Sequence, residues 1–398
     1  MRILMIAPEP FFEPRGTPFS EYHRIRALLD LGHTVDLVTY PFGQAVSLPG
    51  LRVFRCLRPP LVRQVKIGPS LAKVPLDLAL TLTVMRRALA ERYDAIHSHE
   101  EGAAIGIVLS ALLGIPHVYD MHSSLPQQLS NFAYSRSRML RWVFDRFERA
   151  AVRHSKVVIV ICPELRRLVQ ALEPGAEPVL IENAPGADDA AVGTPAAARA
   201  AWGVGASTPL VVYTGTFEAY QGLDLLFAAA ALVRASRPDA RFLLAGGRPD
   251  QVAAARRDAS AAGVRDTIIF TGERPSTEIP AILAAADVLV SPRSRGTNTP
   301  LKIYQYLRSG RAIVATRLLT HTQVLDDTVA ILTGVSPREF ADGILAALAD
   351  PAMAAAVGGR AAELAATKYS YDAYLERTRE VVARVTSAPR PQVAGGVA

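Results

Sequence analysis

The chain has 398 residues, half of them hydrophobic. That is more than one ordinary core accommodates, so two domains of about two hundred residues each are expected. Its 44 Lys and Arg against 37 Asp and Glu leave a net charge of +7. No apolar run approaches the roughly eighteen residues of a membrane span, and the apolar start is too short for a signal peptide. We therefore expect a cytoplasmic protein without a transmembrane helix.

Two cysteines are present, Cys56 and Cys162, without CxxC spacing. A disulfide framework and a zinc site are not predicted, and both thiols are expected in the core.

The basic excess is uneven along the chain. Between Arg52 and Arg92, nine Lys and Arg accompany only Asp77 and Glu91. This segment is either an ordinary solvated face, which is the commoner case, or a surface for anionic lipid or a phosphorylated acceptor. Nucleic acid is not an expected partner, because neither aromatic interleaving nor a known motif accompanies the charge.

Short apolar strands alternate with helices through the first half. The chain opens on the apolar run 2–7, a Pro-rich loop and a helix that Gly32 ends. The same pattern then repeats, which predicts crossover connections and a parallel sheet covered on both faces. The predicted strands are residues 34–40, 51–57, 94–99, 116–122, 156–162 and 177–183, and the helices include a long stretch to Tyr93, 101–113 and 163–172.

An Ala-, Gly- and Pro-rich stretch without strand periodicity separates this half from a second series of the same kind. We predict an N-terminal domain at 1–185, a linker at 186–208, a C-terminal domain at 209–369, a helix at about 370–386 that returns to the first domain, and a disordered tail at 387–398. The second series has predicted strands at 209–215, 241–247, 267–272, 287–292 and 312–316.

The predicted fold class is therefore α/β, with two doubly wound, Rossmann-like parallel sheets. In such sheets a ligand binds outside the carboxyl ends of the strands, so a site is expected in a cleft built from the loops that follow strands.

One of these loops favours a phosphate group. In the stretch 291–316, SPRSRGTNTPLKIYQYLRSGRAIVAT, Thr299 can cap a helix that starts at Pro300, runs to about Arg308 and is ended by Gly310. The helix N-terminus presents free N–H groups and a positive dipole end, and Lys302 adds a full charge.

Several motifs together resemble the retaining GT-B glycosyltransferases of family four. They are the Gly32–Val35 turn, YTGTFEAYQGLDLL at 213–226, the strand 287–291, and P-x-K-x-x-Q-Y-x-x-x-G-x-x-I-V-A-T from Pro300 to Thr316. The resemblance implies a GT-B fold and transfer of a sugar from a nucleotide-sugar donor, held by the C-terminal domain, to an acceptor hydroxyl with retention. It also implies that no metal or other cofactor is needed.

Four signature positions depart from the family pattern. Thr216 and Gln221 stand where the family carries Arg and Lys, and Thr297 and Gln305 stand where it carries two Glu. Neutral substitutes are weaker anchors, because charge-assisted hydrogen bonds are about twice as strong as neutral ones. We expect Lys302 to serve as the diphosphate cation. The donor-site residues that the resemblance implies are Gly215, Thr216, Gln221, Gly272, Glu273, Arg274, Arg293, Thr297, Asn298, Thr299, Leu301 and Gln305.

In the first half, the resemblance places His122 near the reacting sugar, and His122 and Lys302 are the candidate catalytic residues. Gly16 and Thr17 match the acceptor-side loop, where a small residue admits close backbone contact. His97 and His99 have no third well-spaced partner in the sequence, so a metal site is not predicted.

The resulting hypothesis is a metal-independent retaining hexosyltransferase of glycan synthesis. Its expected partners are a nucleotide sugar, a sugar, lipid-linked or small-molecule acceptor, and an anionic membrane surface that the enzyme binds peripherally. Two alternatives remain open: a non-catalytic GT-B protein that binds a nucleotide sugar or a glycan, and an enzyme similar to nucleotide-sugar epimerases.

Overall fold

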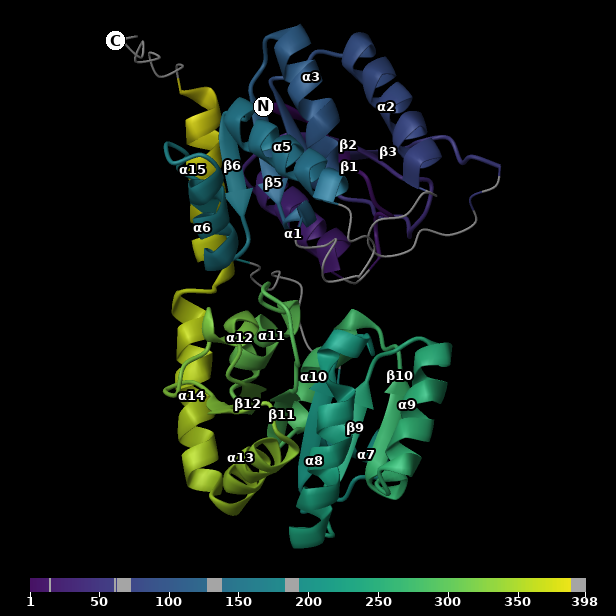
Figure 1. Cartoon of the computed structure of the whole chain (residues 1–398), viewed down its shortest axis with the longest axis vertical. Coiled ribbons are helices and arrows are strands. Elements are labelled where there is room, and N and C mark those ends of the chain that lie inside the picture. Colours follow the sequence, from purple (N-terminus) through teal and green to yellow (C-terminus); the bar gives the residue numbers. More distant parts are fainter. Residues whose placement is uncertain (14–15, 61, 63–72, 127–137, 183–192, 388–398) are drawn as a thin grey trace. The chain divides into compact units, whose positions relative to one another are not determined.

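The computed structural model describes residues 1–13, 16–60, 62, 73–126, 138–182 and 193–387 (Figure 1). The chain divides into two compact units, residues 1–182 with 374–398 and residues 183–373. Most of the predicted disordered tail, and the linker as far as residue 192, lie outside the described residues. The remainder of the linker contains a short helix, α7 (Pro195–Ala201), whose N-terminus is capped by the Thr194 side chain.

The first unit is built on a seven-stranded, all-parallel sheet of order β3-β2-β1-β4-β5-β6-β7. Its strands correspond to the apolar runs of the sequence. Except in β3, at the edge of the sheet, their side chains are almost entirely buried, as expected of a sheet covered on both faces. The strands are β1 (Arg2–Ala7), β2 (Thr34–Thr39), β3 (Leu51–Arg55), β4 (Ala95–His99), β5 (His117–Met121), β6 (Val157–Val160) and β7 (Val179–Leu180).

Strand side chains alternate between the two faces of this sheet. Leu4 and Ile6 pack beneath α2, whereas Ile3 and Met5 pack with α1 on the other face. Helices α3, α5 and α6 continue the layer that α2 begins, and α15 contributes Val382 to the α1 side. The helices are α1 (Gly16–Asp30), α2 (Lys73–Ala90), α3 (Ala103–Leu113), α5 (Arg138–His154), α6 (Pro163–Leu172) and α15 (Tyr371–Thr386), with a 3-10 turn η1 (Glu100–Gly102) before α3.

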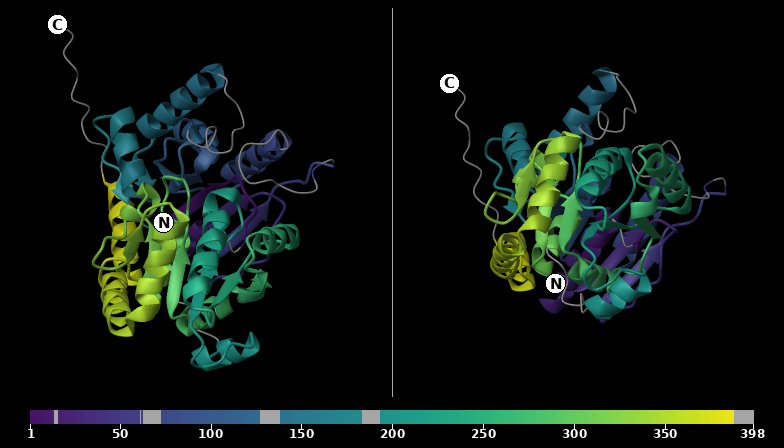
Figure 2. Two further views of the ribbon diagram at one scale, coloured as in Figure 1. Left: turned by 60° about the horizontal axis from the view of Figure 1, so that its bottom comes forward. Right: turned by 90° about the horizontal axis from the view of Figure 1, so that it is seen from below.

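The second unit repeats the architecture with a six-stranded parallel sheet of order β10-β9-β8-β11-β12-β13 (Figures 1 and 2). The predicted two-sheet α/β fold class is thereby confirmed. The strands are β8 (Leu210–Thr214), β9 (Arg241–Ala245), β10 (Ile268–Gly272), β11 (Val288–Ser291), β12 (Ala312–Thr316) and β13 (Ile331–Thr333).

Helices cover both faces of this second sheet. Helices α8, α9 and α13 pack with Val211 and Val290, whereas α10, α11 and α14 pack with Val212 and Leu289. The helices are α8 (Leu223–Ser236), α9 (Pro249–Ala261), α10 (Ile279–Ala285), α11 (Leu301–Ser309), α12 (Leu319–Thr322), α13 (Pro337–Ala349) and α14 (Pro351–Thr367), with the 3-10 turns η2 (Ala219–Gln221), η3 (Arg265–Thr267) and η4 (Ser276–Glu278).

Both cysteines lie in the core, as predicted. Within the described ranges no single helix is long and apolar enough to cross a bilayer; α13 and the helices after it reach the criterion only together, as a pair bent by 101°.

Candidate active site

In the second unit, glycines let the loops after β8, β9 and β11 approach one another closely. A Cβ at Gly246 would lie 2.0 Å from the carbonyl oxygen of Gly215, and a Cβ at Gly222 would lie 2.0 Å from that of Pro292. All three glycines also have a positive φ, which side-chain-bearing residues rarely adopt. The carboxyl ends of three adjacent strands are therefore joined backbone to backbone, at the edge where ligands of doubly wound sheets bind.

Lys302 reaches this edge from the first turn of α11. Its Nζ lies 3.3 Å from Oε1 of Gln221 and 3.9 Å from the ring centroid of Tyr213, and the residue is only 7 % exposed. A methyl group on Gly215 would stand 3.6 Å from the same Nζ. The structure thus brings together Lys302, Gln221 and Gly215, three residues of the predicted site. Gln221 in turn lies within 3.4 Å of the Thr216 hydroxyl.

A second cation lies close to this group. Arg293 donates from Nη1 to the Asn298 carbonyl at 3.0 Å and to the Thr320 hydroxyl at 2.8 Å. Among the described residues, neither Arg293 nor Lys302 forms an ion pair with a carboxylate. Burial lowers the pKa of Arg293; burial and then the Arg293 charge lower the pKa of Lys302 well below its ordinary value. An anion bound here would relieve both penalties.

The predicted Thr299 cap is wrong. Pro300 itself is the N-cap of α11, in an extended conformation and without a side-chain cap. The Thr299 hydroxyl is buried and has no hydrogen-bond partner among the described residues. Proline can occupy this position because its missing N–H is not needed there. The predicted helix end is confirmed, since Gly310 follows the last helical residue with a left-handed φ of 68°.

The other residues of the predicted donor set lie on α11 and at the ends of, or in the loops after, β10 and β11. The backbone carbonyl of Thr297 accepts from Gln323, and Leu301 and Gln305 are half-buried on α11. On the β10 loop, Gly272 accepts from the Gly246 N–H and Glu273 is exposed. Arg274 binds Glu278 at 2.5 Å and lies over the Trp202 ring, so its charge is already paired.

In the first unit a buried polar cluster gathers at the carboxyl ends of β4 and β5. His97, His99, Asp120 and His122 come from these strand ends, and Arg24 comes from α1. Arg24 Nε donates to Asp120 Oδ2 at 2.8 Å, and both side chains are almost completely buried. The Tyr374 ring of α15 covers the guanidinium at 5.0 Å. This ion pair links α1 to the middle of the sheet.

Hydrogen bonds extend from the ion pair to the candidate catalytic histidine. His97 Nε2 lies 3.2 Å from Asp120 Oδ2, and His122 Nε2 lies 3.4 Å from Asp120 Oδ1. His99 Nδ1 lies 2.9 Å from the same Nε2 of His122. Burial lowers the pKa of His122 to about 4, against the opposing effect of Asp120, so its imidazole is neutral at pH 7.

The carboxyl groups of the cluster are shifted in opposite directions. Burial alone would raise the pKa of Asp120, but Arg24 and then the histidines hold it well below its ordinary value. Burial, and then the neighbouring Glu9, raise the pKa of Glu21 well above its ordinary value; burial, and then Glu101, do the same for Glu100. Asp120 therefore carries the negative charge, while Glu21 and Glu100 favour the protonated form.

The structure brings a third candidate metal ligand, Asp120, close to His97 and His99, and the sequence interpretation did not find it. One ligand atom each of His97, His99 and Asp120 lie within 4.8 Å of one another. However, the Arg24 guanidinium already occupies Asp120 Oδ2, and a cation there would be repelled by it. A hydrogen-bond network accounts for these contacts without a metal.

Gly16 and Thr17 begin α1. Gly16 has a left-handed φ of 50°, and a Cβ there would meet no atom within 4 Å. The glycine is thus explained by its backbone conformation.

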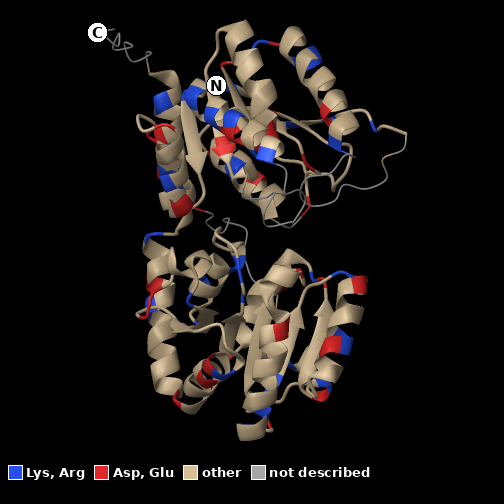
Figure 3. Cartoon of the chain, in the orientation of Figure 1, with Lys and Arg blue, Asp and Glu red and all other residues tan. Residues whose placement is uncertain are grey.

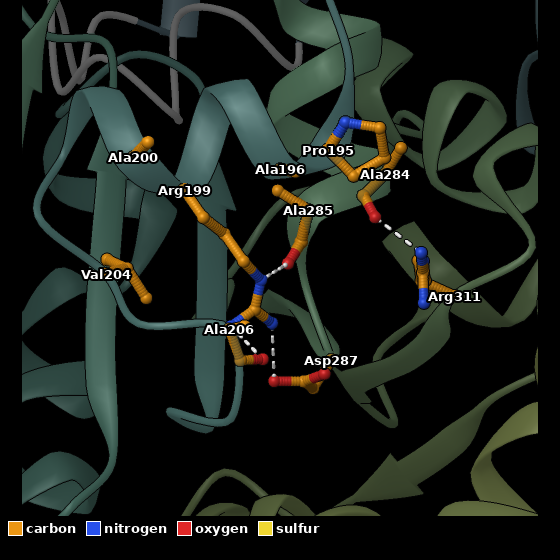
Figure 4. Close-up of a pocket in the computed structure, with 10 residues that line it drawn as sticks. All are labelled: Pro195, Ala196, Arg199, Ala200, Val204, Ala206, Ala284, Ala285, Asp287 and Arg311. Atoms are coloured by element: carbon orange, nitrogen blue, oxygen red, sulfur yellow. Dashed lines mark hydrogen bonds and ion pairs between the residues drawn. The ribbon is translucent and has the colours of Figure 1, made fainter.

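An open pocket of about 410 Å³ in the second unit lies elsewhere (Figure 4). It is lined by α7 and by Ala285, Asp287 and Arg311, which precede β11 and β12. Arg199 spans it, donating to the Ala285 carbonyl and pairing with Asp287 at 2.9 Å (Figure 4). This is the amino-end edge of the sheet, opposite to Lys302, so the pocket is not the candidate site.

Comparison with known proteins identifies the family. A model described as "Glycosyl transferase 4-like domain" matches residues 22–185, and one described as "Glycosyl transferases group 1" matches residues 208–350. A D-inositol 3-phosphate glycosyltransferase of Pseudarthrobacter chlorophenolicus is 30 % identical over 294 residues, which cover 70 % of this chain and 68 % of that protein. The chain is a group 1, family-four glycosyltransferase.

Further relatives agree with this assignment. The alpha-D-kanosaminyltransferase of Streptomyces kanamyceticus is 27 % identical over 307 residues, covering 73 % of this chain and 76 % of that one. The solved sucrose-phosphate synthase of Thermosynechococcus elongatus aligns with a TM-score of 0.77 at 19 % identity, over 96 % and 98 % of the two chains. Anabaena HepE, solved with UDP and glucose, aligns with a TM-score of 0.75 at 17 % identity, over 96 % and 99 %. These structures confirm the GT-B fold.

Four residues of the candidate site were missed in the sequence. Glu21 and Arg24 lie three positions apart on the helical face that also buries Ile25 and Leu28, and charged residues on an apolar stripe were the available signal. Asp120 ends a strand directly before the His122 loop. Tyr213, beneath Lys302, carried no signal beyond its place in an apolar strand.

Proposed function

We propose that this glycosyltransferase transfers a hexosyl group from a nucleotide sugar to an acceptor hydroxyl with retention of configuration. The observation that carries the proposal is a pair of cations at the ligand-binding edge of the second sheet, the buried Lys302 and the half-buried Arg293, neither of which pairs with a carboxylate among the described residues. Two such charges suit the diphosphate of a nucleotide sugar. They also replace the charge that the family carries at the positions of Thr216 and Gln221.

In this proposal Lys302 contributes to catalysis by electrostatic stabilisation. Negative charge develops on the leaving diphosphate as the bond to the sugar breaks, and a buried ammonium stabilises that charge more strongly than water would. The free N–H groups at the start of α11 add to the same field. The released diphosphate, rather than a protein base, accepts the proton of the acceptor hydroxyl. No metal or other cofactor is required by this scheme.

His122 is proposed to bind a hydroxyl group of the reacting sugar or of the acceptor. The ionised Asp120 attracts a proton to Nε2 of His122, so Nδ1 of His99 accepts a hydrogen bond from it. Nδ1 of His122 is then the unprotonated ring nitrogen, the kind of atom that accepts from a sugar hydroxyl. A neutral imidazole suits this role across physiological pH.

We further propose that the acceptor is a sugar, a lipid-linked molecule or another small molecule of envelope glycan synthesis, held by the first unit at a side that includes Gly16 and Thr17. One structural neighbour, WaaG, is described as a glycosyltransferase involved in lipopolysaccharide biosynthesis. A lipid-linked acceptor would require the enzyme to work on the cytoplasmic side of a membrane, as a peripheral protein.

Calorimetric titration with UDP, GDP and ADP tests the donor site. UDP comes first because HepE was solved with it. We expect selective binding of one nucleotide and at least about tenfold weaker binding by Lys302→Ala, the scale of a charged hydrogen bond. Lys368→Ala is the matched control, because Lys368 also lies over a tyrosine ring, at 4.9 Å, but is exposed. Absence of binding by all three nucleotides would contradict the proposal.

A second candidate function follows from the four signature substitutions. Without the family's Arg, Lys and two Glu, the protein could bind a nucleotide sugar or glycan without transfer, or process the sugar as an epimerase-like enzyme does. Product analysis distinguishes these cases: a transferred hexose supports the first proposal, whereas an epimerised or hydrolysed sugar, or bound donor without turnover, supports the second.

A further inference from the structure

Large apolar side chains are exposed mainly on one part of the first unit. Of the thirteen exposed large hydrophobic residues in the described ranges, ten lie on α2, α3 and α5. We call the exposed sides of these three helices the α2–α3–α5 face. Its apolar residues are Val74, Leu78, Leu82, Leu89, Val108, Leu112, Leu113, Met139, Trp142 and Val143.

Helix α2 carries two apolar stripes instead of one. Leu76, Leu80 and Val84 are fully buried against the sheet. On the other side, Leu78 and Leu82 are 64 % and 59 % exposed, with Val74 and Leu89 on the same stripe. A surface helix of a globular protein needs only the inner stripe and places polar residues outside. The outer stripe therefore needs a different explanation.

Helix α3 presents the same feature without any charge. Its sequence, AAIGIVLSALL, contains no ionisable residue, and it buries Ala103, Gly106 and Leu109. Val108 and Leu112, on the outer side, are 56 % and 68 % exposed. Figure 3 shows α3 without acidic or basic residues along its length.

Helix α5 combines exposed apolar side chains with positive charge (Figure 3). Met139 and Trp142 are 75 % and 61 % exposed, and Val143 follows them. Its five arginines are all exposed, whereas Glu148 is buried and leaves Asp145 as the exposed carboxylate of the helix. The exposed arginines are Arg138, Arg141, Arg146, Arg149 and Arg153.

The three helices form one layer. Ile105 and Leu109 of α3 share a core cluster with α2, and Ile107 of α3 shares the next cluster with α5. Both clusters lie on the same side of the sheet, opposite to α1, and Figure 1 shows α2 beside α3. The exposed apolar residues therefore belong to neighbouring helices of a single surface.

We propose that the α2–α3–α5 face docks on an anionic lipid bilayer. This inference rests on the peripheral membrane association proposed above and assigns it to particular residues. Amphipathic helices bind bilayers by burying apolar side chains at the headgroup boundary while Lys and Arg contact anionic lipid. Tryptophan is favoured at that depth. The three helices carry eight Lys and Arg against three Asp and Glu, so a second copy of the same face would be repelled electrostatically.

Vesicle flotation of the full chain tests the partner. We expect co-flotation with vesicles of phosphatidylglycerol and phosphatidylcholine, but not with phosphatidylcholine alone. Met139→Ser/Trp142→Ser should weaken binding about tenfold or more through lost apolar burial, and glutamine at Arg138, Arg141 and Arg146 about fivefold per arginine. Leu57→Ser is the matched control, because Leu57 is 80 % exposed but lies outside the three helices.

Tryptophan fluorescence tests the location. The chain has two tryptophans, so Trp202→Phe leaves Trp142 as the only emitter. We expect a blue shift of Trp142 emission on adding anionic vesicles, and quenching by brominated lipid. Flotation without these changes would overturn the assigned surface. Absence of flotation by a preparation that binds UDP, GDP or ADP would overturn docking without affecting the proposed transferase, and flotation by a preparation that binds none of the three would do the reverse. Concentration-dependent self-association abolished by Met139→Ser/Trp142→Ser would assign the face to a second copy instead.

Discussion

The two units differ in the carboxyl groups that they bury. All six buried Asp and Glu of the described residues, namely Glu21, Asp36, Glu100, Asp120, Glu148 and Glu182, belong to the first unit. The described part of the second unit buries Lys302 and no carboxylate. Two sheets of the same class therefore support sites of different chemistry, because the difference lies in the loops and not in the strands.

The contrast indicates a division of work. In the first unit, carboxyl groups and neutral imidazoles can both accept and donate hydrogen bonds, which suits the hydroxyl groups of a sugar and an acceptor. In the second unit, Lys302 and Arg293 pair with no carboxylate among the residues that the structure describes, and their pKa values are lowered, which suits a diphosphate. Changes in charge should therefore affect the stability of the first unit and the ligand affinity of the second.

The largest expected effect is on stability, from Asp120→Asn. This substitution keeps the side-chain volume but leaves the Arg24 charge buried and unpaired. Breaking one partner of a buried ion pair costs about 3 to 5 kcal/mol. Chemical denaturation should show this loss in the free energy of unfolding, and Arg24→Met in the same chain should recover part of it.

Asp239→Asn is the control, because Asp239 pairs with Arg237 at an exposed position and its loss should leave the unfolding midpoint unchanged. If Asp120→Asn behaved in the same way, the Arg24 pair would not stabilise the first unit.

Glu148→Gln should reveal a second buried carboxyl of that unit. Burial raises the pKa of Glu148 to about 7, although Ser124 donates to it at 3.2 Å. A carboxyl group whose pKa is raised in the folded state stabilises the fold at low pH, where it is protonated. This contribution is lost as the pH rises from the pKa of the unfolded chain through the folded pKa of about 7. At pH 8 the glutamine variant should therefore be more stable than the parent by about 2 to 3 kcal/mol.

The same two proteins compared at pH 5 supply the internal control, because protonated Glu148 and glutamine are then alike. A difference in stability that is independent of pH would mean that Glu148 does not titrate in this range.

The fold was predictable because its signals are local. Continuous apolar runs between helical segments indicated parallel strands, and Gly310 marked a helix end that the structure confirms. Thr299 shows the limit of such signals: a residue suited to capping stands one position too early, because Pro300 already has the extended conformation that an N-cap needs.

The site was predictable only in part, because its contacts are not local. Gln221 and Lys302 are 81 positions apart, and Arg24 and Asp120 are 96 apart. Spacing along a chain cannot show that such residues meet. Lys302 was predicted because Thr299 and Pro300 mark a helix start in the sequence. A single charged residue within α1, such as Arg24, is instead expected to be exposed to solvent until its burial is known.

The next prediction moves the cation of the second unit. Lys302→Gln should weaken nucleotide binding by about 1.5 to 3 kcal/mol, the range for a charged hydrogen bond. Adding Gln221→Lys restores a cation at the position where the family carries Lys. In the parent, Oε1 of Gln221 lies 3.3 Å from Nζ of Lys302. Calorimetry should then show most of the lost affinity restored. Gln221→Lys alone serves as the control, because it places a second ammonium group beside that of Lys302.

The smallest effect is expected from Arg274→Ala, and it decides whether the second site has two cations or three. Arg274 was predicted to bind the donor, but its guanidinium pairs with Glu278 and lies 5.5 Å over Trp202. Breaking a surface pair of this kind costs at most about 1 kcal/mol, and it should leave nucleotide affinity within about twofold. A tenfold loss, without a change in unfolding temperature, would mean that Arg274 leaves Glu278 for the ligand, because a residue that only supports the fold could not reduce affinity while stability is kept.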